Sequence, residues 1–301
     1  MPNVWSHILF GRAALKHSGS PLPSDPNPFH LGCQGPDFLL YHHFWPWKRG
    51  HEVSSLGSAI HRDHCGPFLL DLIDAAVEHP GMRDYVSGFL THYILDRRTH
   101  PYIVYRSGDG KYKHQKLEVI IDTLLAERLE GIRTWKTPVV PWIIIGSRFP
   151  RQWVEVLQWT ALKHFPEEAG TISPEDWNQA YRDMLKALRF FFDPWGIKWL
   201  LTLGYISPFR YRPVHDGNDY LNERQTEWLH PAQPEEKHRE SFLMLWESAL
   251  TEASDLLQQT QAFWKRELSL ETLSTHIGDL SYDTGKPSSS GMKNQIAEPI
   301  V

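Results

Sequence analysis

Histidines and carboxylates recur at helical spacing in the first half of the chain. His92 and Asp96 are four positions apart, and His114 and Glu118 repeat that spacing, with His100 between the two pairs. Residues four apart on an α-helix lie on the same face, one turn above the other, so each pair can direct its side chains toward one ion. Imidazole and carboxylate are the ligands that zinc takes where no thiolate is offered. The pattern therefore predicts a zinc site and metal-assisted attack on an ester.

Histidine is concentrated near the start of the sequence. Of the 17 histidines, 12 lie within the first 114 residues, about twice the share that even spreading would give. A lone histidine usually caps a helix or satisfies a buried polar group, but two spaced pairs on consecutive helices favour metal binding. Cys33 and Cys65 are too few for a disulfide framework, and each is more typical of a buried free thiol than of a metal ligand. The carboxylates interleaved with the histidines are Asp37, Asp63, Asp71, Asp96, Glu118 and Asp122.

The overall charge and hydropathy restrict the class of protein. The 301-residue chain has a net charge of −5 with neutral histidines. This charge argues against non-specific binding to a nucleic acid backbone, so no stable nucleic acid complex is expected. A nuclease whose metal ions supply the positive charge is still compatible with it. The sequence contains no run of about 18 uncharged apolar residues, so no transmembrane segment is expected. The first residues lack the basic region, long apolar run and cleavage site of a signal peptide, which favours a cytoplasmic protein.

Apolar residues recur at helical spacing along most of the chain. Hydrophobic residues make up 41% of the sequence, and we predict a single all-α domain over residues 1–275. The segment 139–145 is nearest to a strand, but Pro141 argues against a central one. Residues 205–231 are either a functional lid or a solvated loop, and residues 276–301 predict a disordered tail. Helices are expected over residues 4–16, 54–62, 67–78, 82–98, 113–130, 150–164, 174–192, 195–204 and 234–263.

The order of these histidines and carboxylates resembles that of the zinc-dependent phospholipase C family, whose fold is shared with fungal and plant single-strand nucleases. The resemblance covers roughly residues 1–125 and is strongest over residues 85–122. There the family pattern is His-x-x-x-Asp, then a histidine near a proline, then His-x-x-x-Glu. Family members are all-helical and hold three zinc ions at the bottom of a cleft. The resemblance therefore implies a multi-helix domain with a metal cluster at the base of a cleft.

The family's metal ligands are matched by residues of this chain. His92 and Asp96 match the first pair, whose aspartate bridges two zinc ions in the family. Asp37, in QGPD, resembles an early aspartate, and we expect it both to bind metal and to accept a proton, so that Asp37 and Asp96 are the candidate catalytic residues. Exported members begin with a tryptophan that binds the third ion, whereas Trp5 is internal, so two or three zinc ions are implied. The implied ligands are His7, Asp37, His61, His92, Asp96, His100, His114 and Glu118.

Some residues depart from the family pattern. His100 comes sooner after the first pair than in the family, and it precedes Pro101 instead of following a proline. Asp122, one turn past Glu118, is interpreted either as a residue that orients a metal-bound histidine or as an ordinary acid on the helix surface. Three histidines without a clear family counterpart could replace an implied ligand: His42, His43 and His64.

Hydrolysis of a phosphoric ester is the chemistry that the resemblance implies. Zinc lowers the pKa of a bound water from about 15.7 toward 7, and the resulting hydroxide can attack phosphorus. The expected partner is a phosphodiester substrate, with phospholipid as one candidate. A nuclease or nucleotide phosphatase would use the same chemistry. A non-catalytic, metal-stabilised helical protein is a third hypothesis; its site would be closed, whereas a catalytic zinc site keeps one open position.

Overall fold

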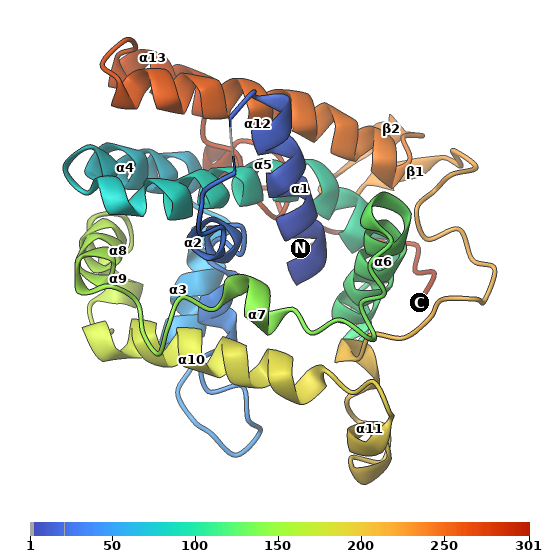
Figure 1. The fold of residues 1–301 in the computed structure, drawn as a ribbon. Helices are drawn as coiled ribbons and strands as arrows, with labels where there is room; N and C mark the ends of the chain where they lie inside the picture. The colour runs from blue at the N-terminus through green and yellow to red at the C-terminus, as the bar shows by residue number, and fades with distance from the viewer. Residues whose placement is uncertain (1–2, 21) are drawn as a thin grey trace.

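The longest helix, α5 (Arg83–Ser107), is buried along most of its length and forms the centre of the molecule (Figure 1). It carries His92, Asp96 and His100, so the core surrounds the helix on which the predicted ligands are concentrated. A helix that is packed on all sides can hold polar groups away from water at fixed positions. Four helices that contact α5 are α1 (Val4–His17), α2 (Asn27–Gly32), α4 (Cys65–Glu78) and α12 (Phe242–Trp264).

The computed structural model describes residues 3–20 and 22–301. No helix in this part of the chain is both long and apolar enough to cross a bilayer. The remaining α-helices are α3 (Glu52–Ile60), α6 (Lys113–Glu130), α7 (Val140–Ile143), α8 (Arg151–His164), α9 (Pro166–Ala169), α10 (Pro174–Phe191), α11 (Ile197–Leu201) and α13 (Leu270–Ile277). Short 3₁₀ helices are η1 (Asp37–Tyr41), η2 (Pro80–Met82), η3 (Ser207–Phe209) and η4 (Ser288–Ser290).

Local sequence signals set the ends of several helices. Before α10, the side chains and backbones of Ser173 and Asp176 bond to one another reciprocally in a capping box. The N-terminus of α12 is capped by Ser241, whose Oγ accepts the N–H of Met244 at 3.2 Å. Gly131 ends α6 with a left-handed φ of 65°. Backbone N–H and C=O groups at the end of a helix have no partner inside the helix, and each of these residues helps to provide one.

A short hairpin interrupts the helices of the second half. Strands β1 (Trp228–His230) and β2 (Gln233–His238) pair antiparallel, and the ring of Trp228 stacks on that of His238 at 4.3 Å. Strand β2 occupies the start of the helix expected from residue 234, and the helix begins later, as α12, after the Ser241 cap. This hairpin forms the only sheet within residues 3–20 and 22–301, and the expected all-α class is confirmed.

The central helix is longer than its sequence suggests. An end near residue 98 is expected, but α5 continues through Pro101 to Ser107. Proline has no N–H to donate four residues back, so the carbonyl of Arg97 loses its partner within the helix. The backbone of Gly285 lies directly against that carbonyl oxygen, at a left-handed φ of 65°, and a side chain at this position would overlap with it. A glycine from the end of the chain thus fits the gap that the proline creates.

The C-terminal segment crosses back over the helices, although the sequence predicts a disordered tail over residues 276–301. Tyr282 is buried, and its backbone N–H donates to the carbonyl of His61 at 3.0 Å. Further along, the N–H of Ile300 donates to the carbonyl of Arg106 at 2.9 Å. A polar segment of this kind is fixed by backbone hydrogen bonds and one buried aromatic ring, and neither produces a periodic pattern in the sequence.

Candidate metal centre

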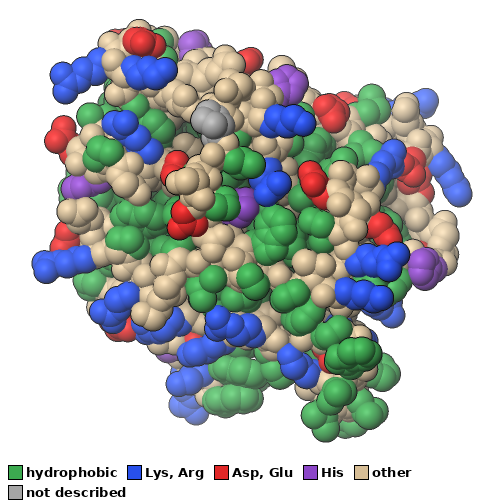
Figure 2. Space-filling view, viewed as in Figure 1, with side chains coloured by type: hydrophobic (Ala, Val, Ile, Leu, Met, Phe, Trp, Pro, Cys, Tyr) green, Lys and Arg blue, Asp and Glu red, His purple; other side chains and the backbone are tan. Residues whose placement is uncertain are grey.

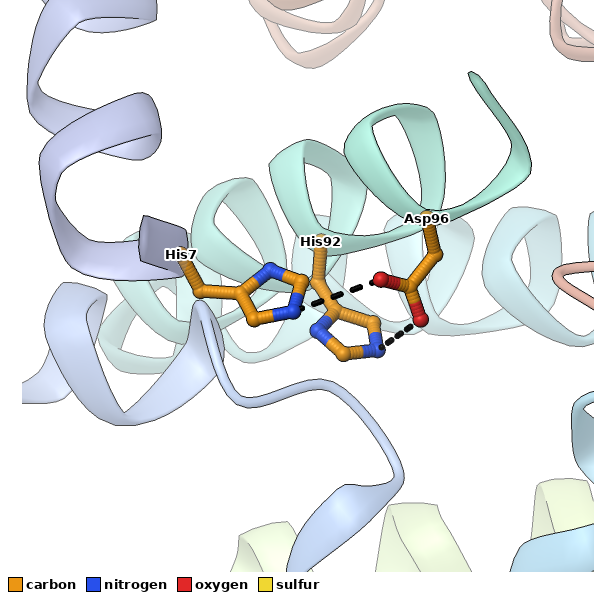
Figure 3. A group of neighbouring side chains, drawn as sticks. All are labelled: His7, His92 and Asp96. Carbon is orange, nitrogen blue, oxygen red and sulfur yellow. Dashed lines mark ion pairs between the residues drawn. The ribbon is translucent and has the colours of Figure 1, made fainter. Parts of the chain in front are cut away.

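His7, His92 and Asp96 converge in the core and are called here the inner triad (Figure 3). One carboxylate oxygen of Asp96 lies 3.3 Å from Nε2 of His7, and the other lies 3.3 Å from Nε2 of His92. His7 belongs to α1, and the other two residues lie one turn apart on α5. All three side chains are buried. Donors of a tetrahedral zinc ion bound at about 2.0–2.1 Å stand about 3.3 Å apart, so the observed separations fit that geometry.

The inner triad contains buried polar atoms that have no hydrogen-bond partner in the described chain. These atoms are both ring nitrogens of His7, Nε2 of His92 and both carboxylate oxygens of Asp96. An unpaired buried polar atom costs about 1–3 kcal/mol, so native proteins rarely leave several of them together. Two imidazoles and a carboxylate with unfilled bonding capacity fit a bound cation, and this donor set suits zinc.

Asp37 and His61 extend the inner triad beyond His92. Oδ1 of Asp37 lies 3.0 Å from Nε2 of His61 and 3.8 Å from Nε2 of His92. Asp37 begins η1, and His61 directly follows α3. Gly35 has a left-handed φ of 49°, and a side chain there would overlap with the ring of His92. The Asp37 side chain keeps 15% of its surface exposed, so solvent can reach this side of the cluster.

His100, His114 and Glu118 form a second group, called here the outer triad. Nε2 of His114 lies 3.3 Å from Nε2 of His100 and 2.7 Å from Oε1 of Glu118. His114 and Glu118 are one turn apart on α6, while His100 shares a face of α5 with Asp96 because that helix is continuous through Pro101. His100 and Glu118 are buried, but His114 keeps 25% of its side chain exposed.

Backbone carbonyls orient two histidines of the inner cluster. Nδ1 of His92 lies 3.1 Å from the carbonyl oxygen of Cys33, and Nδ1 of His61 lies 2.6 Å from that of Gly57. A carbonyl oxygen can only accept, so each Nδ1 donates and carries the proton. The lone pair of a neutral ring is then on Nε2, the atom that faces the carboxylates, which is the tautomer that metal binding requires.

The C-terminal segment contributes residues that the sequence reasoning missed. The carbonyl oxygen of Asp283 lies 2.9 Å from Nδ1 of His100, so Nε2 of His100 carries the lone pair that faces His114. The Asp283 carboxylate is 3.8 Å from the same Nδ1. The ring of Tyr282 packs edge-on against that of His61, with 5.1 Å between centroids. Asp283 is separated by 183 positions from His100, and neither Asp283 nor Tyr282 matches a motif, so no local signal identifies them.

Asp122 positions a helix and does not contact a histidine in the way that the sequence suggests. Its buried carboxylate accepts the backbone N–H groups of Trp5 at 3.0 Å and Ser6 at 2.8 Å, and the hydroxyl of Tyr211 at 2.7 Å. Burial raises the pKa of Asp122 to about 6 in spite of these bonds. Because the first N–H groups of a helix have no partner inside it, this acid from α6 caps α1 and fixes the position of His7.

The carboxylates of the two triads are held in their charged form. Burial alone would raise the pKa of Asp96, but the imidazoles of His92 and His7 outweigh it and hold that pKa well below its ordinary value. Burial also opposes ionisation of Glu118, and His114 beside it holds the Glu118 pKa below its ordinary value. Both acids are therefore anionic at neutral pH, the state in which a carboxylate binds a cation.

Five further residues considered from the sequence lie outside both triads: Cys33, Cys65, His42, His43 and His64. Burial raises the pKa of both cysteine thiols to about 12, so they stay protonated, which agrees with buried free thiols. The rings of His42 and His43 stack on one another at 3.8 Å. The ring of His64 packs against that of His164.

Comparison with known proteins identifies the family of the chain. A family model described as zinc dependent phospholipase C matches residues 6–165, which is more than half of the chain. The chain therefore belongs to the zinc-dependent phospholipase C family, and the resemblance seen in the sequence is confirmed. Membership supports zinc as the metal and a phospholipase C-like hydrolase as the class. No curated protein and no solved structure matches. The matched region contains all eight implied ligands, but not Asp283.

Proposed function

We propose that the protein is a zinc-dependent phosphoric ester hydrolase of phospholipase C type that attacks a phosphodiester with a metal-activated water. The observation that carries the proposal is the inner triad, where two buried histidines and a buried aspartate face one another with unfilled bonding capacity. Family membership supplies the metal and the reaction class. Bound zinc would provide a water of lowered pKa and would neutralise the phosphate.

The eight implied ligands divide into the two triads, with Asp37 and His61 added to the inner one. Asp96 directs one oxygen to His7 and the other to His92, as expected for a carboxylate shared between two ions. Asp37 is the candidate proton acceptor, because it touches His61 and His92 yet remains partly exposed to water. His100, His114 and Glu118 would hold a further ion.

Exposure supports a catalytic centre over a purely structural one. A structural zinc site is closed by four protein ligands, whereas a catalytic site keeps a position for water or substrate. Asp37 and His114 each retain exposed surface, so the cluster is not sealed from solvent. A nuclease or nucleotide phosphatase would use the same ligands, and the substrate comparison below separates these possibilities from a phospholipase.

The proposal is tested by zinc analysis together with turnover of phosphatidylcholine, single-stranded DNA, a nucleotide and a small chromogenic phosphodiester. Asp96→Asn keeps the size of the side chain but removes the shared charge, so we expect less bound zinc and a fall in phosphodiester turnover on the order of 10²-fold or more. Asp74→Asn, at an exposed position on α4, is the matched control and should change neither. Tight zinc binding without hydrolysis of any substrate would establish the structural role instead.

A further inference from the structure

The turn that carries α11 exposes large apolar side chains to solvent. Exposed fractions reach 85% for Trp195, 77% for Leu201 and 94% for Leu203, and Ile197 and Leu200 are also exposed. Figure 2 shows the corresponding apolar projection at the lower right of the molecule, at the place of α11 in Figure 1. Soluble proteins seldom present so many neighbouring large apolar side chains unless a partner covers them.

A second apolar tip lies on the same edge of the molecule. Trp47, in the loop 44–49, is 70% exposed, and its ring stacks on that of Trp45 at 4.9 Å. This loop is joined to the α11 region through the end of α10. Trp45 packs against Phe190 at 5.0 Å, and the neighbouring Phe191 stacks on Phe209 of η3, just after α11, at 4.6 Å. The loop 44–49 and residues 195–205 are together called the apolar edge.

The structure holds the exposed turn in a defined shape. The buried carboxylate of Asp193 accepts the N–H groups of Lys198 and Trp199, at 3.2 and 2.9 Å, and so caps α11. Nε1 of Trp199 donates to Oγ of Ser207 at 2.8 Å. Leu203 adopts a left-handed φ of 51°, which is costly for a branched residue, and the residue is 94% exposed. These local hydrogen bonds therefore hold the turn in a shape that leaves its apolar side chains in solvent.

Positive charge surrounds the apolar edge. Residues 183–212 contain five Lys or Arg and two acids, the buried Asp183 and Asp193, so this stretch has a formal charge of +3 in a chain of net charge −5. The loop 44–49 adds Lys48 and Arg49, both exposed, and has no acid. Figure 2 shows blue side chains along the lower edge of the molecule, between and beside the apolar projections. Apolar and tryptophan side chains ringed by cations are typical of surfaces that enter the boundary between headgroups and acyl chains.

We propose that the apolar edge docks this protein on a lipid bilayer that carries anionic headgroups. The surrounding cations would repel a second copy of the same surface, whereas they attract an anionic membrane. The docked surface is next to the metal centre, because η3 packs on α6, which carries His114 and Glu118. Tyr211, two residues after η3, also donates a hydrogen bond to Asp122, the acid that caps α1. The docking does not depend on the proposed function. Only the further step, that the bilayer supplies the substrate, rests on that function.

The experiment is sedimentation of the zinc-loaded full-length protein with vesicles of phosphatidylcholine, with and without phosphatidylserine. We expect binding that requires phosphatidylserine and weakens with salt. Leu200→Ser combined with Leu203→Ser should weaken vesicle binding on the order of tenfold or more. Trp159→Ser, which removes an exposed tryptophan on α8, is the matched control and should bind as the wild type does. Arg189→Gln combined with Arg212→Gln should remove most of the dependence on phosphatidylserine.

Absence of vesicle binding by the wild-type protein, or equal binding by the double leucine variant, would overturn the docking proposal. Self-association that the leucine changes abolish, without vesicle binding, would overturn it in favour of a second copy. Turnover of a small soluble phosphodiester keeps the two proposals separate, because the leucine variant should retain it. A protein that binds vesicles but hydrolyses none of the phosphodiesters would keep the docking surface and lose the proposed function.

Discussion

The inner and outer triads use similar donors but differ in how the protein holds them. The inner triad is sealed in the core, and Asp96 is in contact with both of its histidines. The outer triad lies nearer to solvent, and its orientation depends on Asp283, which is outside the family match. Because the inner triad is buried, a change to it should cost much free energy of unfolding. The geometry of the outer triad depends instead on the C-terminal segment that orients His100. Stability and metal occupancy should therefore respond separately to changes in the two triads.

Removal of one imidazole from each triad should give the largest difference. In the metal-free protein, His92→Ala leaves the Asp96 carboxylate buried beside a cavity, and we expect a loss of about 3 to 5 kcal/mol in the free energy of unfolding. His114→Ala removes a partly exposed partner of Glu118 and should cost about 1 kcal/mol or less. Urea unfolding of the EDTA-treated proteins at neutral pH measures both. Equal losses would show that burial does not distinguish the triads.

Acid should destabilise the metal-free protein through His30, a histidine that lies outside both triads. Burial lowers the pKa of His30 to about 4, so the folded state keeps this ring neutral while the unfolded state binds a proton below about pH 6.5. Stability is then complete above pH 6.5 and is lost as the pH falls toward 4, by up to about 3 kcal/mol. His30→Gln should flatten this part of a curve of unfolding free energy against pH. If the slope of unfolding free energy against pH is the same in the variant, His30 is not the group responsible for the loss of stability in acid.

Displacement of the C-terminal segment should affect the outer triad selectively. Gly285→Val would overlap with the carbonyl of Arg97 and should lower the free energy of unfolding by about 1 to 3 kcal/mol. We also expect it to weaken zinc binding at the outer triad while the inner zinc is retained. Gly291→Val is the matched control, because Gly291 has a similar φ of 61° and open space around it. Stepwise removal of zinc by a chelator measures the result, and equal loss of all zinc would contradict a division between the triads.

The smallest effect is expected from the side chain of Asp283. Its carbonyl makes the 2.9 Å contact with His100, while its carboxylate is more distant, at 3.8 Å, and partly exposed. Asp283→Asn keeps the carbonyl and removes one charge, so zinc affinity should change by less than about tenfold, in contrast to Gly285→Val. Zinc titration by calorimetry provides the comparison. A larger loss would mean that the carboxylate itself binds metal.

The spacing of residues predicted which side chains of the candidate site lie together within single helices. His92 with Asp96 and His114 with Glu118 are paired as a helical repeat of four requires. The extension of α5 past Pro101 could not be predicted, because proline normally ends a helix and Gly285, which packs against the freed carbonyl, is distant in sequence. Asp283 was missed for the same reason: a backbone carbonyl leaves no signature in the side-chain sequence.

The cap on α1 shows a related limit of local reasoning. The sequence places Asp122 on the face of Glu118, but it does not show that the N-terminus of another helix meets this carboxylate. Likewise, the expected helix near α11 carried no indication that most of its apolar side chains face solvent, because hydrophobicity alone does not separate a core face from an exposed one. Both features depend on tertiary packing.

The contact between His100 and Asp283 has a consequence for the order in which the two proposed metal sites would form in a newly made chain. The two residues are 183 positions apart, so a ribosome adding about 5–20 residues per second completes the second roughly 10 to 40 s after the first. Throughout that interval the nascent chain has both inner-triad helices but lacks the carbonyl that orients His100. We therefore expect zinc to be captured first at the inner triad during synthesis, and at the outer triad only after Asp283 has been made.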